Sequence, residues 1–433
     1  MDRQISLDGP AGTRDFFPED MLIREWLFNK WKQISKSFGF VQYDGPVLEN
    51  AELYTRKGGD DILNEMYSFT KDNVKLSLRP EMTPTVSRMV MKRLPTDVPP
   101  FKWFSIPQCW RYENTTRGRK REHYQWNSDI FDAAPITSEI EVLTMIVTFF
   151  KSVGLTTDDL TIKVSNRMIL QDVLTKMGVS EELFPRACVL IDKLDKLSRE
   201  DLTNLLKTEI GLTEENVNTI YQLCEVTNFD NMIRFLNNET FVEMKQIFDI
   251  AKETGLSDWL SFDASVVRGL SYYTGIVFEG FFKNTTMKRA VCGGGRFDDL
   301  LEKYGYRERV SAIGFGFGDV VILEVLKELN LLPKLSNKCD YLVVPYDMSF
   351  YGKAVNISER LRSKGYNVET YNSNLKKGRI SDAYNYADKR GIQYVVLLAP
   401  DEWKEGKICV KNMLEKDKIR KQSIVEIEDF FLN

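Results

Sequence analysis

Four short segments of the 433-residue chain combine charged, hydroxyl and glycine residues in patterns that could bind a charged small molecule. The first is Arg79-Pro80-Glu81-Met82-Thr83-Pro84, which places a carboxylate and a hydroxyl at an expected strand-to-helix junction. Such a pair can hold an ammonium group by charge-assisted hydrogen bonds. Taken alone, the segment is better explained by Thr83 capping the helix and Glu81 lying on the surface.

The second segment consists of two aromatic-rich stretches, Cys109–Glu113 and Arg121–Asp129, joined by a basic loop. Side chains alternate along a strand, so Arg111 and Glu113 share a face and could bind a phosphate and an adenine amine. A cross-strand salt bridge is the favoured alternative for an isolated Arg-x-Glu. A bulge or bend near residue 127 is needed to bring the polar residues of the return strand to one face; these are His123, Gln125, Ser128 and Asp129.

Glycines mark the other two segments, Val267–Gly275 and the pair Cys292–Asp298 with Gly314–Asp319. Glycines beside Arg268 and two tyrosines suggest backbone close to a ligand, and aromatic packing explains them equally well. The run CGGGRFD could line a nucleotide pocket, and GFGFGD would let a ligand approach a helix start. A GxGxG pattern alone is weak, because a dinucleotide fold also needs a βαβ unit that we do not find.

Composition excludes several classes of site. His123 is the only histidine, which rules out multi-histidine metal sites and mechanisms that use two histidines. The six cysteines are scattered, so no zinc knuckle or redox pair is expected. The sequence contains no apolar run of about 18 residues, so no membrane span is expected. The net charge of -4 opposes indiscriminate nucleic-acid binding, but Arg117–Arg121 and Lys376–Arg379 form basic patches that are either nucleic-acid contacts or solvated loops.

Hydrophobic periodicity predicts the elements that position these segments. The expected helices of the first 331 residues are 18–38, 82–93, 138–153 and 318–330, with helical repeats over 168–256. The expected strands lie at 40–46, a hairpin over 66–79 with Asp72-Asn73 as its turn, 101–113, 121–132, 161–165, 259–281, 288–292 and 307–317. The last hundred residues alternate between strands at 341–345, 368–371, 394–398 and 407–411 and helices at 349–364 and 380–390, which predicts a small α/β domain with a mixed sheet.

Together the four segments are far more specific than any one, and the whole chain resembles the histidyl-tRNA synthetases of class II. Gly12-Thr13-Arg14-Asp15 is similar to the family's N-terminal signature. The helix from Pro18 and the strand through Pro46 resemble motif 1, which builds the dimer interface, and Arg111–Asp129 resembles motif 2. Arg268–Tyr273 and CGGGRFD resemble the two histidyl signatures, which separate this family from glycyl, threonyl and prolyl relatives. The tail resembles the anticodon-binding domain of those relatives.

The resemblance implies roles for individual residues. Asp129 and Tyr273 would each contact one nitrogen of the imidazole. A neutral imidazole has one donor nitrogen and one acceptor nitrogen, so one contact accepts a hydrogen bond and the other donates one. Arg111 would hold the α-phosphate, and Arg268 would stabilise charge near the carboxylate and α-phosphate during adenylation; these two are the candidate catalytic residues. The other expected contacts are Glu81, Thr83, Gln125 and Tyr272 for histidine, and Glu113, Arg119, His123, Gly316 and Gly318 for ATP.

Three positions depart from the family pattern. Ser271 stands where the signature often has Asp, and His123 stands where a Phe usually stacks on adenine. Motif 3 usually reads GLER, with an arginine that clamps the γ-phosphate, but here it reads Gly318-Asp319-Val320-Val321. We expect Arg119 and Mg²⁺ to hold the γ-phosphate instead.

The expected fold is α/β multidomain: an antiparallel-sheet catalytic domain of the class II type (1–166 and 257–331), a helical insertion (167–256) and an α/β anticodon-binding domain (336–433). The expected function is ATP-dependent activation of L-histidine and its transfer to tRNA(His) by a homodimer, with Mg²⁺ bound mainly through ATP. We expect loop 114–121 to meet the acceptor end. A cytoplasmic location is expected, with a mitochondrial pool left open. The rivals are a regulatory or tRNA-sensing paralogue without catalysis, and an ATP-dependent ligase without tRNA.

Overall fold

The computed structural model describes residues 5–56, 60–191, 193–194, 197–226, 229–235, 238–266, 272–336, 339–372, 380–413 and 422–432. The chain forms two compact units, Met1–Pro333 and Lys334–Asn433. The division of the first unit into two catalytic parts and a helical insertion domain stays a prediction.

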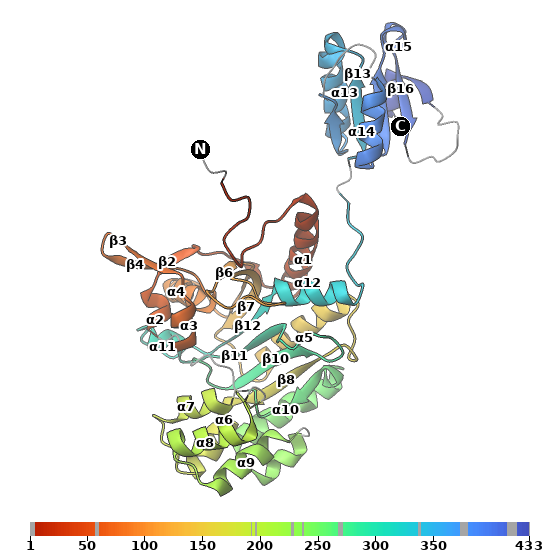
Figure 1. Cartoon of the computed structure of the whole chain (residues 1–433). Helices are drawn as coiled ribbons and strands as arrows, with labels where there is room; N and C mark the ends of the chain where they lie inside the picture. The colour runs from red at the N-terminus through yellow and green to blue at the C-terminus, as the bar shows by residue number, and fades with distance from the viewer. Residues whose placement is uncertain are drawn as a thin grey trace. The chain divides into compact units, whose positions relative to one another are not determined.

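A large sheet runs through the first unit (Figure 1). In the described residues it has nine strands in the order β1-β5-β7-β12-β11-β10-β8-β9, and β6 pairs with β7. Its pairings are antiparallel except for β1 with β5 and β8 with β9, so the expected antiparallel-sheet fold is confirmed. The strands are β1 (Val41–Gln42), β5 (Phe101–Ser105), β6 (Gln108–Trp110), β7 (Glu122–Phe131), β8 (Leu160–Asn166), β9 (Leu260–Phe262), β10 (Ile276–Phe282), β11 (Cys292–Arg296) and β12 (Ala312–Gly318).

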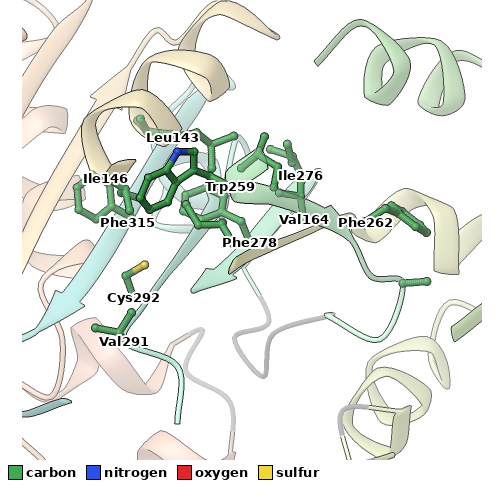
Figure 2. Close-up of a cluster of buried hydrophobic side chains, with 14 of the residues drawn as sticks. Leu143, Ile146, Val164, Trp259, Phe262, Ile276, Phe278, Val291, Cys292 and Phe315 are labelled. Carbon is green, nitrogen blue, oxygen red and sulfur yellow. The ribbon is translucent and has the colours of Figure 1, made fainter. Parts of the chain in front are cut away.

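Aromatic packing fixes which face of this sheet is the core. Trp31 of α1 (Pro18–Ser37) stacks on Trp126 of β7, with ring centroids 5.9 Å apart. The buried Trp126 indole donates a 2.8 Å hydrogen bond to the hydroxyl of Ser35, so its polar atom is satisfied. Figure 2 shows the same core further along, where α5 (Thr137–Ser152) meets strands β10 and β12 through Leu143, Ile146, Phe278 and Phe315. Residues that alternate with Trp126 along β7 therefore face away from this core.

A second, three-stranded sheet has the order β2-β4-β3 and leads into the first candidate segment. The predicted hairpin is confirmed: Asp72 and Asn73 adopt left-handed φ values of 50° and 63° between its strands, which these residue types tolerate. The expected strand at 40–46 is wrong over most of its length, because only Val41 and Gln42 pair in the large sheet. The elements are β2 (Leu48–Asn50), α2 (Glu52–Thr55), α3 (Asp60–Glu65), β3 (Ser68–Lys71), β4 (Val74–Leu78) and α4 (Thr83–Arg93).

The glycine-rich run at 292–296 is a strand rather than the loop after one. The sequence predicts a strand that ends at residue 292, because glycine disfavours strands and three glycines follow. In the structure, β11 begins at Cys292 and includes these glycines. A Cβ at Gly294 would collide with the carbonyl of Gly314 and lie 2.7 Å from the Phe278 ring. Glycine is therefore required by the close approach of β10, β11 and β12. The short helix α11 (Leu300–Lys303) follows β11, and α12 (Asp319–Glu328) follows β12 directly.

Between β8 and β9 the chain is helical, as the periodicity predicts. Buried leucines, isoleucines and phenylalanines from this segment belong to the same cluster of apolar side chains as the sheet core. Four of its helices start at capping residues of the expected type, which are Asn166, Ser198, Thr213 and Asn238. The helices are α6 (Arg167–Lys176), α7 (Phe184–Ile191), α8 (Arg199–Ile210), α9 (Glu214–Cys224) and α10 (Glu239–Glu253), with 3₁₀ turns η1 (Phe229–Arg234) and η2 (Ser257–Trp259).

The second unit contains a mixed five-stranded sheet in the order β14-β13-β15-β16-β17, counted over the residues the structure describes. The first three strands of this order are parallel, and β16 and β17 are antiparallel to their neighbours, which confirms the predicted mixed sheet. The expected basic patch Lys376–Arg379 lies outside the described residues. The elements are β13 (Tyr341–Pro345), η3 (Met348–Phe350), α13 (Tyr351–Ser363), β14 (Val368–Thr370), α14 (Ile380–Arg390), β15 (Tyr394–Leu398), α15 (Pro400–Lys404), β16 (Lys407–Asn412), β17 (Gln422–Glu426) and α16 (Ile427–Leu432).

Across the described ranges, we find no helix with the length and hydrophobicity that a membrane crossing requires.

Candidate active site

Strand β7 presents a row of polar side chains to the face opposite the core. Its ladder with β12 is regular, pairing Gln125 with Gly318, Asn127 with Gly316 and Asp129 with Gly314. The expected bulge near residue 127 is therefore wrong: Ser128 faces the other side, beside Trp126 in the alternation. Gln125 and Asp129 share a face without any irregularity.

Glycines on β12 make room for these side chains. A Cβ at Gly314 would collide with the Asp129 carboxylate, and a Cβ at Gly316 would collide with the Gln125 amide. The polar groups thus lie directly over the backbone of β12. The floor of the site is main chain, which is the role the sequence suggested for glycines near a ligand.

A pocket opens over this floor and joins residues from all four candidate segments. Of the expected site residues, it includes Glu81, Thr83, Arg111, Gln125, Tyr272, Tyr273 and Gly316. The full lining, as far as the described residues show, is Glu81, Thr83, Arg111, Gln125, Asn127, Tyr272, Tyr273, Gly293, Phe297, Gly314, Phe315 and Gly316. Asp129, Glu113, Arg119, His123 and Gly318 are not among the lining residues.

The junction of β4 and α4 places Glu81 inside this pocket. Its side chain is buried, and it accepts a 2.9 Å hydrogen bond from the phenol of Tyr272. The alternative in which Glu81 is a surface residue is therefore wrong. Thr83 does not cap α4 either, because Met82 holds the cap position and no side chain makes a capping bond there. Thr83 is buried at the first turn and lines the pocket.

Asp129 and Asn127 carry acceptors that nothing in the described protein satisfies. Both oxygens of the buried Asp129 carboxylate and the amide oxygen of Asn127 have no hydrogen-bond partner. Burial, and then the charge of Glu81, raise the pKa of Asp129 well above its usual value. A buried acceptor without a partner costs on the order of 1–3 kcal/mol, so such groups commonly serve a ligand. Sequence reasoning missed Asn127, although its place between Gln125 and Asp129 on one strand face could have revealed it.

Charged side chains crowd the mouth of the pocket. The Arg111 guanidinium donates a 2.9 Å hydrogen bond to the carbonyl of Pro80 and lies 3.9 Å from the carboxylate of Glu113. Arg119 forms an ion pair with the other oxygen of Glu113. Arg111 and Glu113 face the same region, but the expected strand is wrong here: β6 ends at Trp110, and a tight turn in which the Glu113 N–H donates to the Arg111 carbonyl brings the two side chains together. The distance between Arg111 and Glu113 is too long for a strong salt bridge, but the alternative of a salt bridge across the hairpin holds for Glu113, whose partner is Arg119.

His123 lies next to this group and is partly buried. Burial, followed by the positive charges of Arg111 and Arg14, lowers the pKa of His123 to about 3. The ring is therefore neutral at physiological pH. A neutral imidazole can stack on a ligand ring but adds no positive charge to the site.

A buried network of ion pairs, which sequence reasoning did not predict, supports the strand that carries the site. Arg14 contacts Glu122 at 2.7 Å and Asp319 at 2.9 Å. Asp319, fully buried at the start of α12, also accepts a 2.9 Å hydrogen bond from the backbone N–H of Tyr124. The N-terminal segment, β7 and α12 are thereby held together. Buried charges are retained when paired in this way.

Arg268, the predicted histidine and α-phosphate contact, lies outside the described residues together with 267 and 269–271. The two tyrosines that follow are well placed. Tyr272 and Tyr273 are both buried, pack with ring centroids 4.9 Å apart, and line the pocket.

Family models account for both units of the chain. Residues 12–318 match the model described as histidyl-tRNA synthetase, and residues 340–433 match the model described as anticodon binding domain. The chain belongs to the histidyl-tRNA synthetase family. The predicted relationship to this family is confirmed, and so is the C-terminal anticodon-binding domain.

Full-length relatives agree with this membership. The chain is 43% identical over 415 residues to a chloroplastic/mitochondrial histidine–tRNA ligase of Arabidopsis thaliana, covering 94% of this chain and 84% of the relative. It is 34% identical to a histidine–tRNA ligase of Leptospira biflexa, covering 96% and 95% of the two chains. The solved histidyl-tRNA synthetase of a Nostoc species shares the fold at 21% identity, with a TM-score of 0.77 and 99% of both chains covered.

Proposed function

We propose that the chain is a histidine–tRNA ligase that activates L-histidine with ATP and transfers it to the 3′ end of tRNA(His). One observation carries the proposal for the site. Polar side chains of one strand face, with unsatisfied acceptors at Asp129 and Asn127, lie above a glycine floor and face a buried carboxylate, Glu81. This arrangement suits a small zwitterion that has a second polar end.

In this proposal, histidine binds between the two groups of acceptors. Glu81, Thr83 and Gln125 hold the α-ammonium, because a carboxylate and two polar oxygens give charge-assisted bonds. Asp129 accepts from one imidazole nitrogen and Tyr273 donates to the other, which satisfies both nitrogens of a neutral ring. Tyr272 orients Glu81 through its hydrogen bond.

ATP lies across the mouth of the pocket. Arg111 binds the α-phosphate, Glu113 accepts from the adenine amine, and the neutral His123 ring stacks on the base. Backbone at Gly316 and Gly318 allows close approach of the nucleotide. The Arg119–Glu113 pair of the free protein has to open or shift for both residues to reach ATP.

Mg²⁺ would be held mainly by the phosphate oxygens of ATP, which are the hard ligands it prefers. The described side chains include no group of three or more His, Cys, Asp or Glu residues placed to hold a metal. The charge of Mg²⁺ would offset that of the phosphates when bound.

Two steps follow from this arrangement. The histidine carboxylate attacks the α-phosphate and pyrophosphate leaves; a tRNA hydroxyl then attacks the aminoacyl carbonyl and AMP leaves. Arg111 and Arg268 stabilise the charge that develops on the α-phosphate. The protein contributes positioning and electrostatics, and no side chain is required as a general base.

The non-catalytic alternative has less support. The relatives at 34% and 43% identity that span nearly the whole chain are themselves named ligases. A fold likeness of TM-score 0.71 to a regulatory subunit/histidyl-tRNA synthetase of Bacillus halodurans, at 19% identity, concerns the fold alone. A ligase without tRNA would leave the anticodon-binding domain without a role.

We further propose a homodimer that works in the cytoplasm. The exposed Val41 and Val47 flank a groove that includes Arg88, Arg93 and Trp103. This is the motif 1 region, and its exposed apolar residues suit a second copy of the chain.

Loop 114–121 would meet the acceptor end of tRNA, and the second unit would meet its anticodon.

The decisive experiment is histidine-dependent exchange of pyrophosphate into ATP, followed by aminoacylation of tRNA(His). Exchange should require histidine and fail with glutamine or asparagine by a factor on the order of 10⁴, since these leave the polar partners incorrectly paired. A purified, folded chain with no exchange would refute the proposed function. Equal exchange with glutamine would refute the pocket assignment.

A further inference from the structure

An arginine outside the four candidate segments lies near the mouth of the pocket without a counter-ion. Arg289 stands in the connection between β10 and β11, three residues before Cys292. Its side chain is partly buried, and it forms no ion pair, side-chain hydrogen bond or ring contact with any residue the structure describes. A partly desolvated guanidinium in this state loses hydration without gaining a partner.

The other arginines around it are already engaged. Arg117 contacts Glu324 at 3.2 Å and Glu328 at 2.7 Å, which fastens the basic loop to α12. Arg14 is held by two buried carboxylates, and Arg119 is paired with Glu113. Unlike these three arginines, Arg289 can offer its charge without breaking an existing ion pair.

Two contacts made by its neighbours locate the Arg289 segment between the basic loop and the start of α12. On one side, Met287 approaches the loop: a Cβ at Gly118 would lie 2.7 Å from its sulfur. On the other side, the carbonyl of Val291 accepts a 3.2 Å hydrogen bond from the N–H of Gly318. The same Cβ at Gly118 would lie 3.5 Å from a methyl of Val321. Met287, two residues before Arg289, and Val321, at the motif 3 arginine position, therefore approach the same point of the loop.

Charge coupling agrees with this placement. Burial lowers the pKa of Arg289, the positive charge of Arg119 lowers it further, and the negative charge of Glu113 opposes the shift. Arg119 and Arg289 are thus close enough to repel each other. Glu113 is the carboxylate that acts on Arg289, and it is already paired with Arg119. A polyanion bound between the two arginines would remove the remaining repulsion.

We propose that Arg289 binds the β- and γ-phosphates of ATP opposite Arg119 and supplies the positive charge that Val321 cannot. The inference rests on the proposed function, because it assigns ATP to this site. A triphosphate bound in line for attack needs cations along its phosphates. The first turn of α12 offers only Asp319 and two valines, and Asp319 is committed to Arg14.

The test compares Arg289→Ala, Arg289→Lys and the neighbouring Lys288→Ala in histidine-dependent exchange. Lys288 is exposed and serves as the matched control for loss of one positive charge. We expect Arg289→Ala to lower kcat/KM for ATP by about 10²-fold, as for removal of a charge-stabilising donor, while KM for histidine stays unchanged. Arg289→Lys should recover part of this loss, and Lys288→Ala should behave like the unmodified chain.

A second measurement separates phosphate binding from a structural effect. Transfer of histidine to tRNA from preformed histidyl-adenylate no longer involves the β- and γ-phosphates, so Arg289→Ala should leave its single-turnover rate unchanged. An unchanged ATP dependence in Arg289→Ala, with an active unmodified chain, would overturn the inference and leave the proposed function intact. A loss equal in exchange and in transfer would also overturn it. No exchange by the unmodified chain would instead refute the proposed function.

Discussion

The phenolic oxygen of Tyr272 lies 2.9 Å from a carboxylate oxygen of Glu81, although 191 residues separate them in sequence. The bond is buried and joins the strand-to-helix junction after β4 to the tyrosine pair before β10. Two candidate segments that carry little meaning separately thus form one wall of the pocket. Tyr272 fixes the carboxylate that we propose for the α-ammonium of histidine.

Replacing Tyr272 with phenylalanine should weaken histidine binding selectively. Loss of one buried hydrogen bond to a charged group costs about 1.5–3 kcal/mol, so KM for histidine should rise by about 10-fold or more, with KM for ATP unchanged. Tyr304→Phe is the matched control, since the Tyr304 phenol donates to the carbonyl of Leu53 rather than to Glu81. Equal effects of both variants on KM for histidine would contradict the positioning role.

The Asp129→Asn variant should be more stable but less active than the unmodified chain. The pKa of Asp129 is raised by burial, so its ionised form destabilises the fold. This penalty is absent below the ordinary carboxyl range and grows as pH rises towards the folded-state pKa. The Tm advantage of Asp129→Asn should therefore increase between about pH 5 and pH 8.

Histidine-dependent exchange by Asp129→Asn should fall, because the amide cannot become the anionic acceptor that Asp129 provides once it ionises. Ser128→Ala, at the adjacent position on the core face of β7, is the control for a general change in stability. A Tm advantage that does not depend on pH would contradict the proposed ionisation.

Much of this fold is readable from sequence, and the reasons for the failures are specific. The hydrophobic periodicity of the sequence predicts helix α1 and strands β13 and β15, and these elements end where the periodic pattern ends. Strand β11 is misplaced because three glycines resemble a loop, while their real cause is contact with β10 and β12 across the sheet. Such a cause involves residues far apart in the chain.

The candidate site likewise has features that can be predicted from local sequence and features that depend on residues far apart in the chain. Regular alternation along β7 puts Gln125, Asn127 and Asp129 on one face, whereas the expected bulge near residue 127 would have broken this pattern. Arg289 lies in no recognisable motif, and its possible role becomes visible only from its neighbours in the folded chain. Arg14 belongs to a recognisable signature, yet its partners Glu122 and Asp319 could be found only in three dimensions.

Removing Arg14 should destabilise the first unit strongly. Arg14→Ala would leave Glu122 and Asp319 buried without their cation, and breaking a buried pair costs about 3–5 kcal/mol. Unfolding followed by tryptophan fluorescence should show this loss. Arg307→Ala, which breaks an exposed pair with Glu308 at 3.1 Å, should change the unfolding free energy by less than about 1 kcal/mol. Similar losses in the two variants would contradict the structural role of the network.

Deleting residues 334–433 should separate activation from tRNA charging. The pocket lies entirely in the first compact unit, so histidine-dependent exchange should remain within a few-fold of the full chain. Aminoacylation should fall, because the anticodon-binding domain is lost. Binding of tRNA by the full chain should weaken as salt rises, since phosphate contacts release counter-ions. Undiminished aminoacylation by the shortened chain would contradict this division.

The main-chain floor of the pocket limits how this site can diversify. At Gly314 and Gly316, even one added methyl group would displace the side chain that reads the substrate. An engineer who seeks a different amino-acid preference therefore cannot usefully vary these two positions of β12. Libraries should instead vary the opposing positions Gln125, Asn127 and Tyr273, where new side chains can alter the volume and polarity of the pocket without dismantling the strand beneath it.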